Sequence, residues 1–124
     1  MSHTLNETSQ FKHQLRRVRK SPRWRPIFEG HVPFDGDDRS PWDYVTDCLL
    51  TGSEIPAYFY VHPLHFPKSL EKQIKRRLQT SEHVTIQVLE LHFDGHNGNH
   101  LLVFYDSTDV TTLLAIGTHS DLFS

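Results

Sequence analysis

The first regular pattern of apolar positions lies close to the N-terminus. Phe11, Leu15 and Val18 fall at i, i+4 and i+7, the spacing of one face of an α-helix. Thr8 or Ser9 precedes this stripe and offers a hydroxyl oxygen as an N-cap. The pattern therefore predicts an amphipathic helix, and the short polar stretch before it is at best an edge strand.

A second helix is marked mainly by its two ends. Ser40 followed by Pro41 supplies a capping hydroxyl and a proline at the first helical position. Gly52 is the residue type that most often ends a helix. The sequence therefore predicts a helix from about Pro41 to Thr51, with an apolar face formed by Trp42, Val45, Leu49 and Leu50.

Two further segments flank this region. Residues 21–40 hold three prolines and two glycines, which predicts a long loop. Its apolar residues indicate that the loop packs against the protein: they are Trp24, Ile27, Phe28, Val32 and Phe34. Residues 67–78 predict a third, short and basic helix, because leucine and isoleucine recur there every four positions.

The period of the pattern changes to two in the last third of the chain. Apolar and polar residues alternate over 84–94, with a phase slip near Leu89 that indicates a bulge. Two more strands are predicted at 101–105 and 111–116, each after a turn. The sequence thus predicts an α+β fold, in which N-terminal helices pack on one face of a small antiparallel meander of about three to four strands.

Length and composition restrict the class of protein. A chain of 124 residues suits one domain, spanning 1–124. No apolar run approaches the ~18 residues that a membrane span needs, so we expect no membrane protein. The N-terminus lacks the features of a secretory signal, and a cytoplasmic location is expected. The single cysteine, Cys48, excludes an internal disulfide and is expected to be a buried thiol rather than a nucleophile.

The formal net charge of -2 conceals a strong asymmetry. Residues 10–26 carry seven cations and no acid, and residues 68–77 carry five cations and one acid, whereas 78–124 contain no Lys or Arg. Two basic segments could follow a phosphate backbone, and the alternative is that they are solvated helix faces. The candidate RNA-binding residues are Lys12, Arg16, Arg17, Arg19, Lys20, Lys68, Lys72, Lys75, Arg76 and Arg77.

Ten histidines are many for this length, and six of them lie beside turns or strand ends. Histidine can act as an acid or a base near neutral pH, so a pair of them could cleave RNA without a metal. For any single histidine the alternative is a surface or structural role. His92, His96 and His100 are four residues apart, but the glycines between them indicate a turn, so adventitious metal binding is the weaker interpretation. No metal or other cofactor is expected.

The C-terminal run from Leu113 to Phe123, which contains Gly-Thr-His, resembles the closing motif of the YafQ branch of RelE-type toxins. The resemblance extends to Thr8-Ser9-Gln10-Phe11-Lys12, to Tyr60-Val61-His62-Pro63-Leu64, to Glu90-Leu91-His92 and to Leu101–Tyr105. It covers most of the chain outside 21–40 and 65–81, which look like insertions.

This resemblance implies a RelE-like fold and a toxin of a bacterial type II toxin-antitoxin module, which cleaves mRNA on the ribosome. It also implies a DinJ-like or RelB-like antitoxin as partner, with operator DNA contacted only through the antitoxin complex. By the same resemblance the catalytic candidates are His62, His92, Asp94, His119 and Phe123, with His96 and His100 as possible auxiliary residues. His92 or Asp94 would be the base, and His119 or His62 the acid.

The sequence departs from the family pattern at three positions. Ala115 stands where the family usually has an arginine, Val61 where it has an aspartate, and His100 where it has a tryptophan. An arginine at such a site stabilises developing negative charge. Either activity is weakened, or His96, His100 or a cation from 68–77 supplies the charge.

Three functional hypotheses remain open at this point. The first is a metal-independent endoribonuclease toxin, and the second is a protein of the same fold that has lost cleavage and only binds an antitoxin or another partner. The third is a histidine-rich metal-binding protein.

Overall fold

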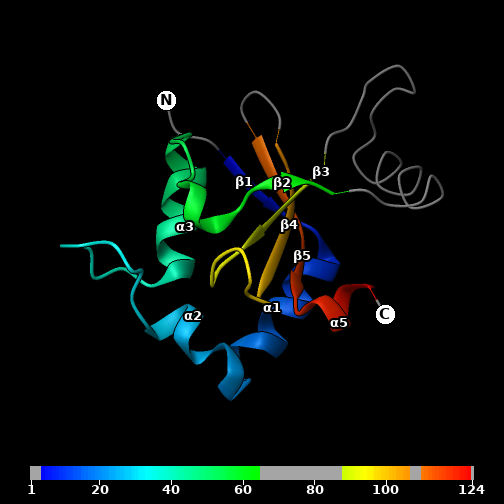
Figure 1. Cartoon of the computed structure of the whole chain (residues 1–124). Helices are drawn as coiled ribbons and strands as arrows, with labels where there is room; N and C mark the ends of the chain where they lie inside the picture. The colour runs from blue at the N-terminus through cyan, green and yellow to red at the C-terminus, as the bar shows by residue number, and fades with distance from the viewer. Residues whose placement is uncertain (1–3, 65–87, 107–109, 124) are drawn as a thin grey trace.

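The computed structural model describes residues 4–64, 88–106 and 110–123. In chain order the elements are β1 (Thr4–Glu7), α1 (Ser9–Arg19), the 3-10 helix η1 (Pro22–Trp24), α2 (Arg25–Glu29), α3 (Pro41–Thr51), the 3-10 helix η2 (Ala57–Phe59), β2 (His62–Pro63), β3 (Val88–His92), β4 (Leu101–Asp106), β5 (Val110–Gly117) and α5 (His119–Phe123) (Figure 1). The helix predicted over 67–78, the start of the strand predicted at 84–94 and the cations Lys68, Lys72, Lys75, Arg76 and Arg77 lie outside the described residues.

The strands form a five-stranded sheet in the order β1-β5-β4-β3-β2. The predicted meander is confirmed, because β3 pairs with β4 and β4 with β5, both antiparallel. The predicted number of three to four strands is wrong, and so is the wholly antiparallel sheet, because β1 pairs in parallel with β5. A two-residue strand such as β2, and a pairing between opposite ends of the chain, leave no periodic signal in the sequence.

The predicted bulge near Leu89 is also wrong. The register between β3 and β4 is unbroken from Val88 to His92. The irregularity lies instead in the β4-β5 ladder, where Val103 pairs with Ala115 and the next residue of β4 pairs with Leu113. Leu114 is therefore the extra residue of a bulge in β5.

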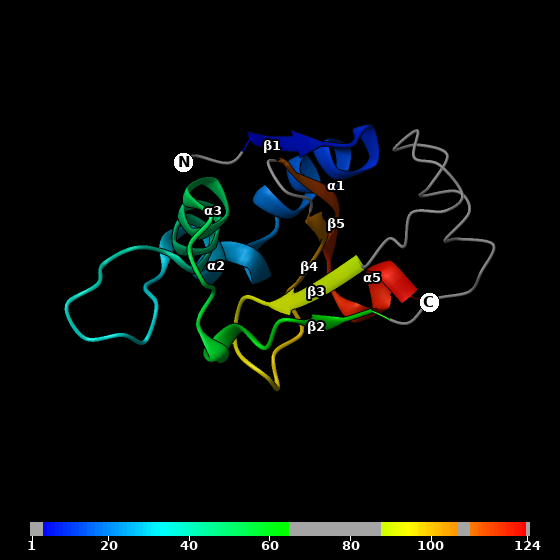
Figure 2. The ribbon, with the colours of Figure 1, turned by 90° about the horizontal axis from the view of Figure 1, so that it is seen from above.

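The two faces of the sheet carry different clusters of apolar side chains. The larger core contains residues of the first three helices and of the sheet face beneath them, among them Phe11, Val45, Leu91 and Phe104. On the other face Val88 and Val103 pack with partly buried residues that include Leu122 of α5. Seen from above, α5 lies on the opposite side of the sheet from α3 (Figure 2).

The α1 and α3 helices form as the sequence predicts. In α1 Phe11 and Val18 are buried, and the last turn carries three arginines, which favours the negative end of the helix dipole. Helix α3 runs over Pro41–Thr51, with Ser40 accepting a hydrogen bond from the N–H of Asp43 and Gly52 in the left-handed region at φ 69°.

The apolar face predicted for α3 needs one correction. Leu50 is 42% exposed, whereas Cys48 is 8% exposed. Positions 41, 45, 48 and 49 share one side of the helix, and Leu50 lies about 100° further round. Burial raises the pKa of the Cys48 thiol, which agrees with the predicted inert cysteine.

The long loop predicted at 21–40 contains two short helices, so that part of the prediction is wrong. Pro22 is the first residue of η1 and Pro26 the second residue of α2, and in the first turn of a helix a proline needs no N–H partner. The predicted packing is confirmed for Trp24, Ile27 and Val32, which are buried. No helix in the described part of the chain is long and apolar enough to span a membrane.

Thr8 joins α1 to the sheet. Its hydroxyl oxygen accepts a hydrogen bond from the N–H of Phe11, and its backbone N–H donates to the carbonyl oxygen of Leu113 in β5 at 3.2 Å. The hydroxyl also lies 3.3 Å from the carbonyl oxygens of Leu113 and Leu114. The N-cap is thus Thr8 and not Ser9, and it fixes the helix to the bulged strand.

We expect the substitution Thr8→Ala to lower the free energy of unfolding by about 1–2 kcal/mol, because the cap and the link to β5 are both lost. Ser9→Ala removes a hydroxyl from the next residue and is expected to have little effect. Urea unfolding followed by circular dichroism measures both variants, and an equal loss in the two would contradict the assignment.

Candidate active site

The candidate site lies on the sheet face that α5 shares. Along β3, Val88, Glu90 and His92 point to one face because successive side chains alternate. His62 of β2 is the direct cross-strand partner of Glu90. The pairing of β2 with β3 therefore brings His62 to Glu90 and His92, from which it is far apart in the sequence.

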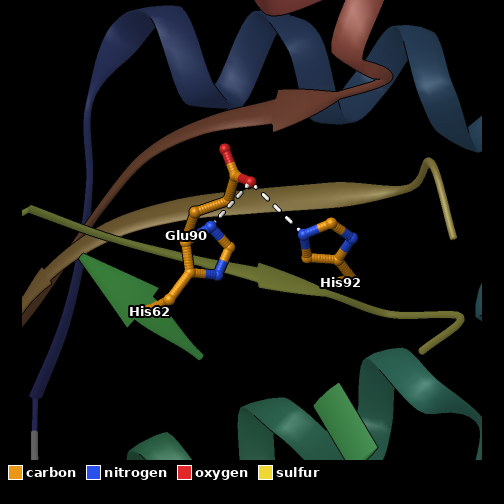
Figure 3. A group of neighbouring side chains, drawn as sticks. All are labelled: His62, Glu90 and His92. Carbon is orange, nitrogen blue, oxygen red and sulfur yellow. Dashed lines mark ion pairs between the residues drawn. The ribbon is translucent and has the colours of Figure 1, made fainter. Parts of the chain in front are cut away.

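The three side chains converge on a single oxygen atom (Figure 3). Glu90 Oε1 lies 3.3 Å from His62 Nε2 and 3.3 Å from His92 Nε2. The Glu90 side chain is only 5% exposed, while those of His62 and His92 are 28% and 13% exposed. The carboxylate thus forms the floor of the site and the two imidazoles form its accessible walls.

Both imidazoles are oriented by backbone carbonyl groups. His62 Nδ1 lies 2.8 Å from the carbonyl oxygen of Tyr60, and His92 Nδ1 lies 2.9 Å from that of Gly98. A carbonyl oxygen only accepts hydrogen bonds, so each Nδ1 must be the donor. In a neutral imidazole the proton is then on Nδ1, and Nε2 keeps its lone pair toward Glu90.

The second carboxylate oxygen of Glu90 is buried and finds no hydrogen-bond partner among the described residues. One oxygen of Glu90 therefore faces the two imidazoles, and the other is a buried acceptor without a donor among the described residues. A carboxylate oxygen and two imidazole lone pairs repel one another unless a proton or a cation lies between them. The arrangement is suited to holding positive charge.

Tyr60 covers the two histidines from one side. Its backbone has a left-handed conformation at φ 51°, which is uncommon for a residue other than glycine and is often found at functional sites. Tyr60 is 40% exposed. Its ring lies 4.5 Å from the His62 ring and 5.4 Å from the His92 ring between centroids, and meets the His96 ring edge-on at 4.1 Å. An exposed aromatic ring thus borders the catalytic candidates.

The loop at 93–100 is held by one carboxylate. Asp94 accepts hydrogen bonds from the backbone N–H groups of Asn99 and His100, and from His100 Nδ1 at 2.7 Å. Burial opposes the ionisation of Asp94, but these hydrogen bonds outweigh it, so its pKa lies below the usual value. A Cβ at Gly98 would overlap the same carboxylate, so any larger residue here would displace the Asp94 side chain.

His100 has a structural environment. Its ring lies edge-on to the indole of Trp24, with 4.6 Å between the centroids. Its Nε2 is buried and has no hydrogen-bond partner within the described segments. His100 therefore packs between Trp24 and Asp94, and the loop that carries Gly98 is fixed.

The short helix α5 brings a third histidine to the same loop. The backbone N–H of His119 donates to Asn99 Oδ1 at 2.8 Å, one residue from the carbonyl that orients His92. The N–H of Thr118 donates to Asp121, which lowers the pKa of that carboxyl, and Arg17 of α1 lowers it further. A cation of the first helix thus lies near α5.

Only some of the predicted site residues lie close together in the structure. His62 and His92 are brought together, and His96 contacts the ring beside them. His119 is exposed at the start of α5, and Phe123 ends that helix, although its side chain lies outside the description. Asp94 is hydrogen-bonded within its own loop. The possible metal-binding trio of His92, His96 and His100 does not come together; the side chains that meet are those of His62, Glu90 and His92.

The cations predicted to bind RNA are exposed where they are described. Lys12, Arg16, Arg17, Arg19 and Lys20 all belong to α1 or its end and lie at the surface. The guanidinium of Arg19 also stacks 4.7 Å from the centre of the Phe28 ring, so it contributes to packing as well.

Sequence reasoning missed two residues of the site. Glu90 has a detectable signal in the sequence. It lies two positions before His92, so the two side chains share one face of the strand, and its charge interrupts the apolar pattern of that strand. Tyr60 has a weaker signal, as an aromatic residue two positions before His62 in an irregular segment. Neither signal is periodic, and the contact with His62 depends on tertiary pairing.

Comparison with known proteins supports the fold. No family model matches the sequence, and no curated protein matches it. The structure is similar to a copper-bound mutant toxin from Helicobacter pylori, with a TM-score of 0.58, 20% identity and 99% of this chain and 100% of that chain covered. It is also similar to a chain of the DinJ-YafQ toxin-antitoxin complex of E. coli, with a TM-score of 0.60 and 14% identity; the match covers 100% of this chain and 100% of that chain. YafQ of E. coli strain BL21(DE3) gives a TM-score of 0.58 at 15% identity over 98% of this chain and 99% of that one. The predicted RelE-like α+β fold and the resemblance to YafQ are confirmed at the level of structure.

We expect Asp94→Asn to lower the free energy of unfolding at pH 7 by about 1–2 kcal/mol, because charge-assisted hydrogen bonds in the loop are weakened. The folded pKa of Asp94 is depressed, so this stabilisation is present above the pKa of the unfolded chain, about 3.9, and is lost as the pH falls through the lower folded value. Denaturant titrations between pH 7 and pH 3 should show the difference shrinking. The variant Asp35→Asn, in an exposed loop, controls for the lost charge, and a pH-independent difference for Asp94→Asn would contradict the assignment.

Proposed function

We propose that this protein is the toxin of a type II toxin-antitoxin module and acts as a ribosome-dependent, metal-independent endoribonuclease. The observation that carries the proposal is the pair of imidazoles, His62 and His92, whose Nε2 atoms meet on the buried carboxylate of Glu90. A third histidine, His119, starts the helix tied to the same loop. The fold that this chain shares with YafQ supports the choice of a toxin over other nucleases.

The contacts favour His92 over Asp94 as the general base. Asp94 is occupied by three hydrogen bonds from the loop, which lower its basicity. His92 has its Nδ1 proton committed to Gly98, so Nε2 is the atom that accepts a proton. Glu90 stabilises the imidazolium that results, because its oxygen lies beside that nitrogen.

In the proposed reaction His92 takes the proton of a ribose 2′-hydroxyl. The 2′-oxygen then bonds to the adjacent phosphorus, and the bond from phosphorus to the 5′-oxygen breaks. His119 gives a proton to that leaving oxygen, and the products are a cyclic phosphate and a free 5′-hydroxyl. His62 contacts the same oxygen of Glu90 from the other side and holds it beside the base, and Tyr60 offers an exposed aromatic side chain on which a nucleobase can stack.

The basic helix α1 supplies the RNA-binding surface of this proposal. Arg17 acts on Asp121 of α5, so a cation of α1 lies close to the helix that His119 begins. We propose that Arg17 replaces the arginine that the family has at position 115. Phosphate contacts of this kind contribute affinity that is independent of sequence and weakens with salt.

The proposed partner is an antitoxin of the DinJ type, since the E. coli neighbour was solved as a DinJ-YafQ complex. The ribosome and mRNA are the proposed targets, and operator DNA is contacted only through the antitoxin complex. An antitoxin segment that orders on α1 would compete with RNA for the same cations. A protein of this fold that binds the antitoxin but no longer cleaves is the other outcome that the experiments below distinguish.

Mapping mRNA ends by primer extension after induced expression tests the chemistry. We expect the wild-type chain to produce discrete cuts within translated codons, and the double variant His92→Ala, His119→Ala to lose them, because general acid-base catalysis contributes roughly 10²–10⁴-fold per group. His31→Ala, in an exposed loop, is the matched control and should cut normally. Wild-type expression without cuts, with antitoxin binding intact, would select the non-catalytic alternative.

Charge reversal tests the proposed competition. Arg16→Glu with Arg17→Glu should weaken binding of both RNA and antitoxin and should reduce the salt dependence of RNA binding by about two phosphate contacts. Arg23→Glu with Arg25→Glu changes the net charge equally outside α1 and should have a smaller effect. Filter binding and calorimetry measure the two partners, and an unchanged antitoxin affinity would refute the overlap.

A further inference from the structure

The group formed by His62, Glu90 and His92 has an excess of acceptor atoms. Both Nδ1 protons are donated outward to the carbonyl oxygens of Tyr60 and Gly98, so no neutral imidazole has a proton left for the centre of the group. Glu90 adds an oxygen to that centre and a second, buried oxygen without a partner among the described residues. Such a set of lone pairs is the donor set of a metal site.

The distances match the dimensions of a tetrahedral site. Zinc-nitrogen and zinc-oxygen bonds of about 2.0–2.1 Å place neighbouring ligand atoms about 3.3–3.4 Å apart at the tetrahedral angle. Glu90 Oε1 lies 3.3 Å from each Nε2, which equals that spacing. The three ligand atoms all lie within 4.8 Å of one another, so small rotations of the two rings complete the geometry.

We propose that His62 Nε2, Glu90 Oε1 and His92 Nε2 bind one divalent transition-metal ion of the zinc class. Two imidazole nitrogens favour such an ion over Mg²⁺ or Ca²⁺, which prefer oxygen ligands. Three protein ligands leave a fourth position for water, and the partial exposure of both histidines gives the ion a path from solvent.

The surroundings are those that support ligating histidines. A metal-bound imidazole usually donates its other N–H to a carbonyl or carboxylate, which fixes the tautomer and the plane of the ring. His62 and His92 both do so before any ion is bound. The carbonyl group of Gly98, which orients His92, is held in place because Asp94 accepts hydrogen bonds from the next two backbone N–H groups of the 93–100 loop.

Metal binding and RNA cleavage then exclude one another. The ion occupies the Nε2 lone pair of His92, which is the atom that would accept the 2′-hydroxyl proton. This consequence rests on the proposed function, whereas metal binding itself depends only on the three side chains. Zinc is therefore expected to act as an inhibitor of the nuclease.

Isothermal titration of the chelator-treated full chain with Zn²⁺ tests the site. We expect one ion per chain at neutral pH, with binding lost in His62→Gln and His92→Gln and strongly weakened in Glu90→Gln. His96→Gln is the matched control, because His96 lies beside the group but contributes no ligand, and it should bind as the wild type does. Circular dichroism establishes that each variant is folded.

Titration with Co²⁺ gives a second readout, since a tetrahedral site produces intense visible absorption bands that the His92→Gln variant should lack. Any of three results would overturn the proposal: a wild-type chain that binds no zinc, a His62→Gln, His92→Gln double variant that still binds it, or a His96→Gln variant that loses it. The two hypotheses fail separately: zinc binding at this group without any RNA cleavage contradicts only the nuclease, and cleavage that saturating zinc leaves unchanged contradicts the proposed exclusion.

Discussion

The buried carboxylate of Glu90 is the constraint on which the site depends. A charged oxygen on the inner part of a sheet is costly unless positive charge or hydrogen-bond donors compensate it. Here that oxygen faces two imidazoles from neighbouring strands, both held from behind by backbone carbonyls, so the compensating charge is a proton or a cation between them. The two rings therefore share one oxygen atom, and displacing either ring changes the surroundings of the other.

The rest of the architecture keeps this group in position. The larger core beneath β3 and β4 sets the plane of the sheet, and the bulge in β5 leads that strand toward α5. The 93–100 loop then links two otherwise separate elements, because Gly98 contacts His92 and Asn99 contacts His119. Asp94 and Trp24 hold this loop through His100, so a segment that looked like an insertion, 21–40, supports the site.

Much of the fold could be predicted from the sequence, since its signals are local. The N-cap near Thr8, the Ser40-Pro41 start and the alternation in the last strands each define an element within a few residues. The parallel pairing of β1 with β5 and the two-residue strand β2 could not be predicted, because they arise from tertiary contacts. The histidines of the site could be named from the sequence, but their convergence on Glu90 could not, because it depends on the pairing of β2 with β3.

The two edges of the sheet differ in how they meet other proteins. One edge is β1, whose residues are mostly exposed and polar, and the other is β2, which has only two residues, one of them Pro63. Proline offers no N–H, so β2 is a poor template for the addition of a foreign strand. Among the described residues, the edge that carries His62 is thus the poorer of the two for the addition of a further strand.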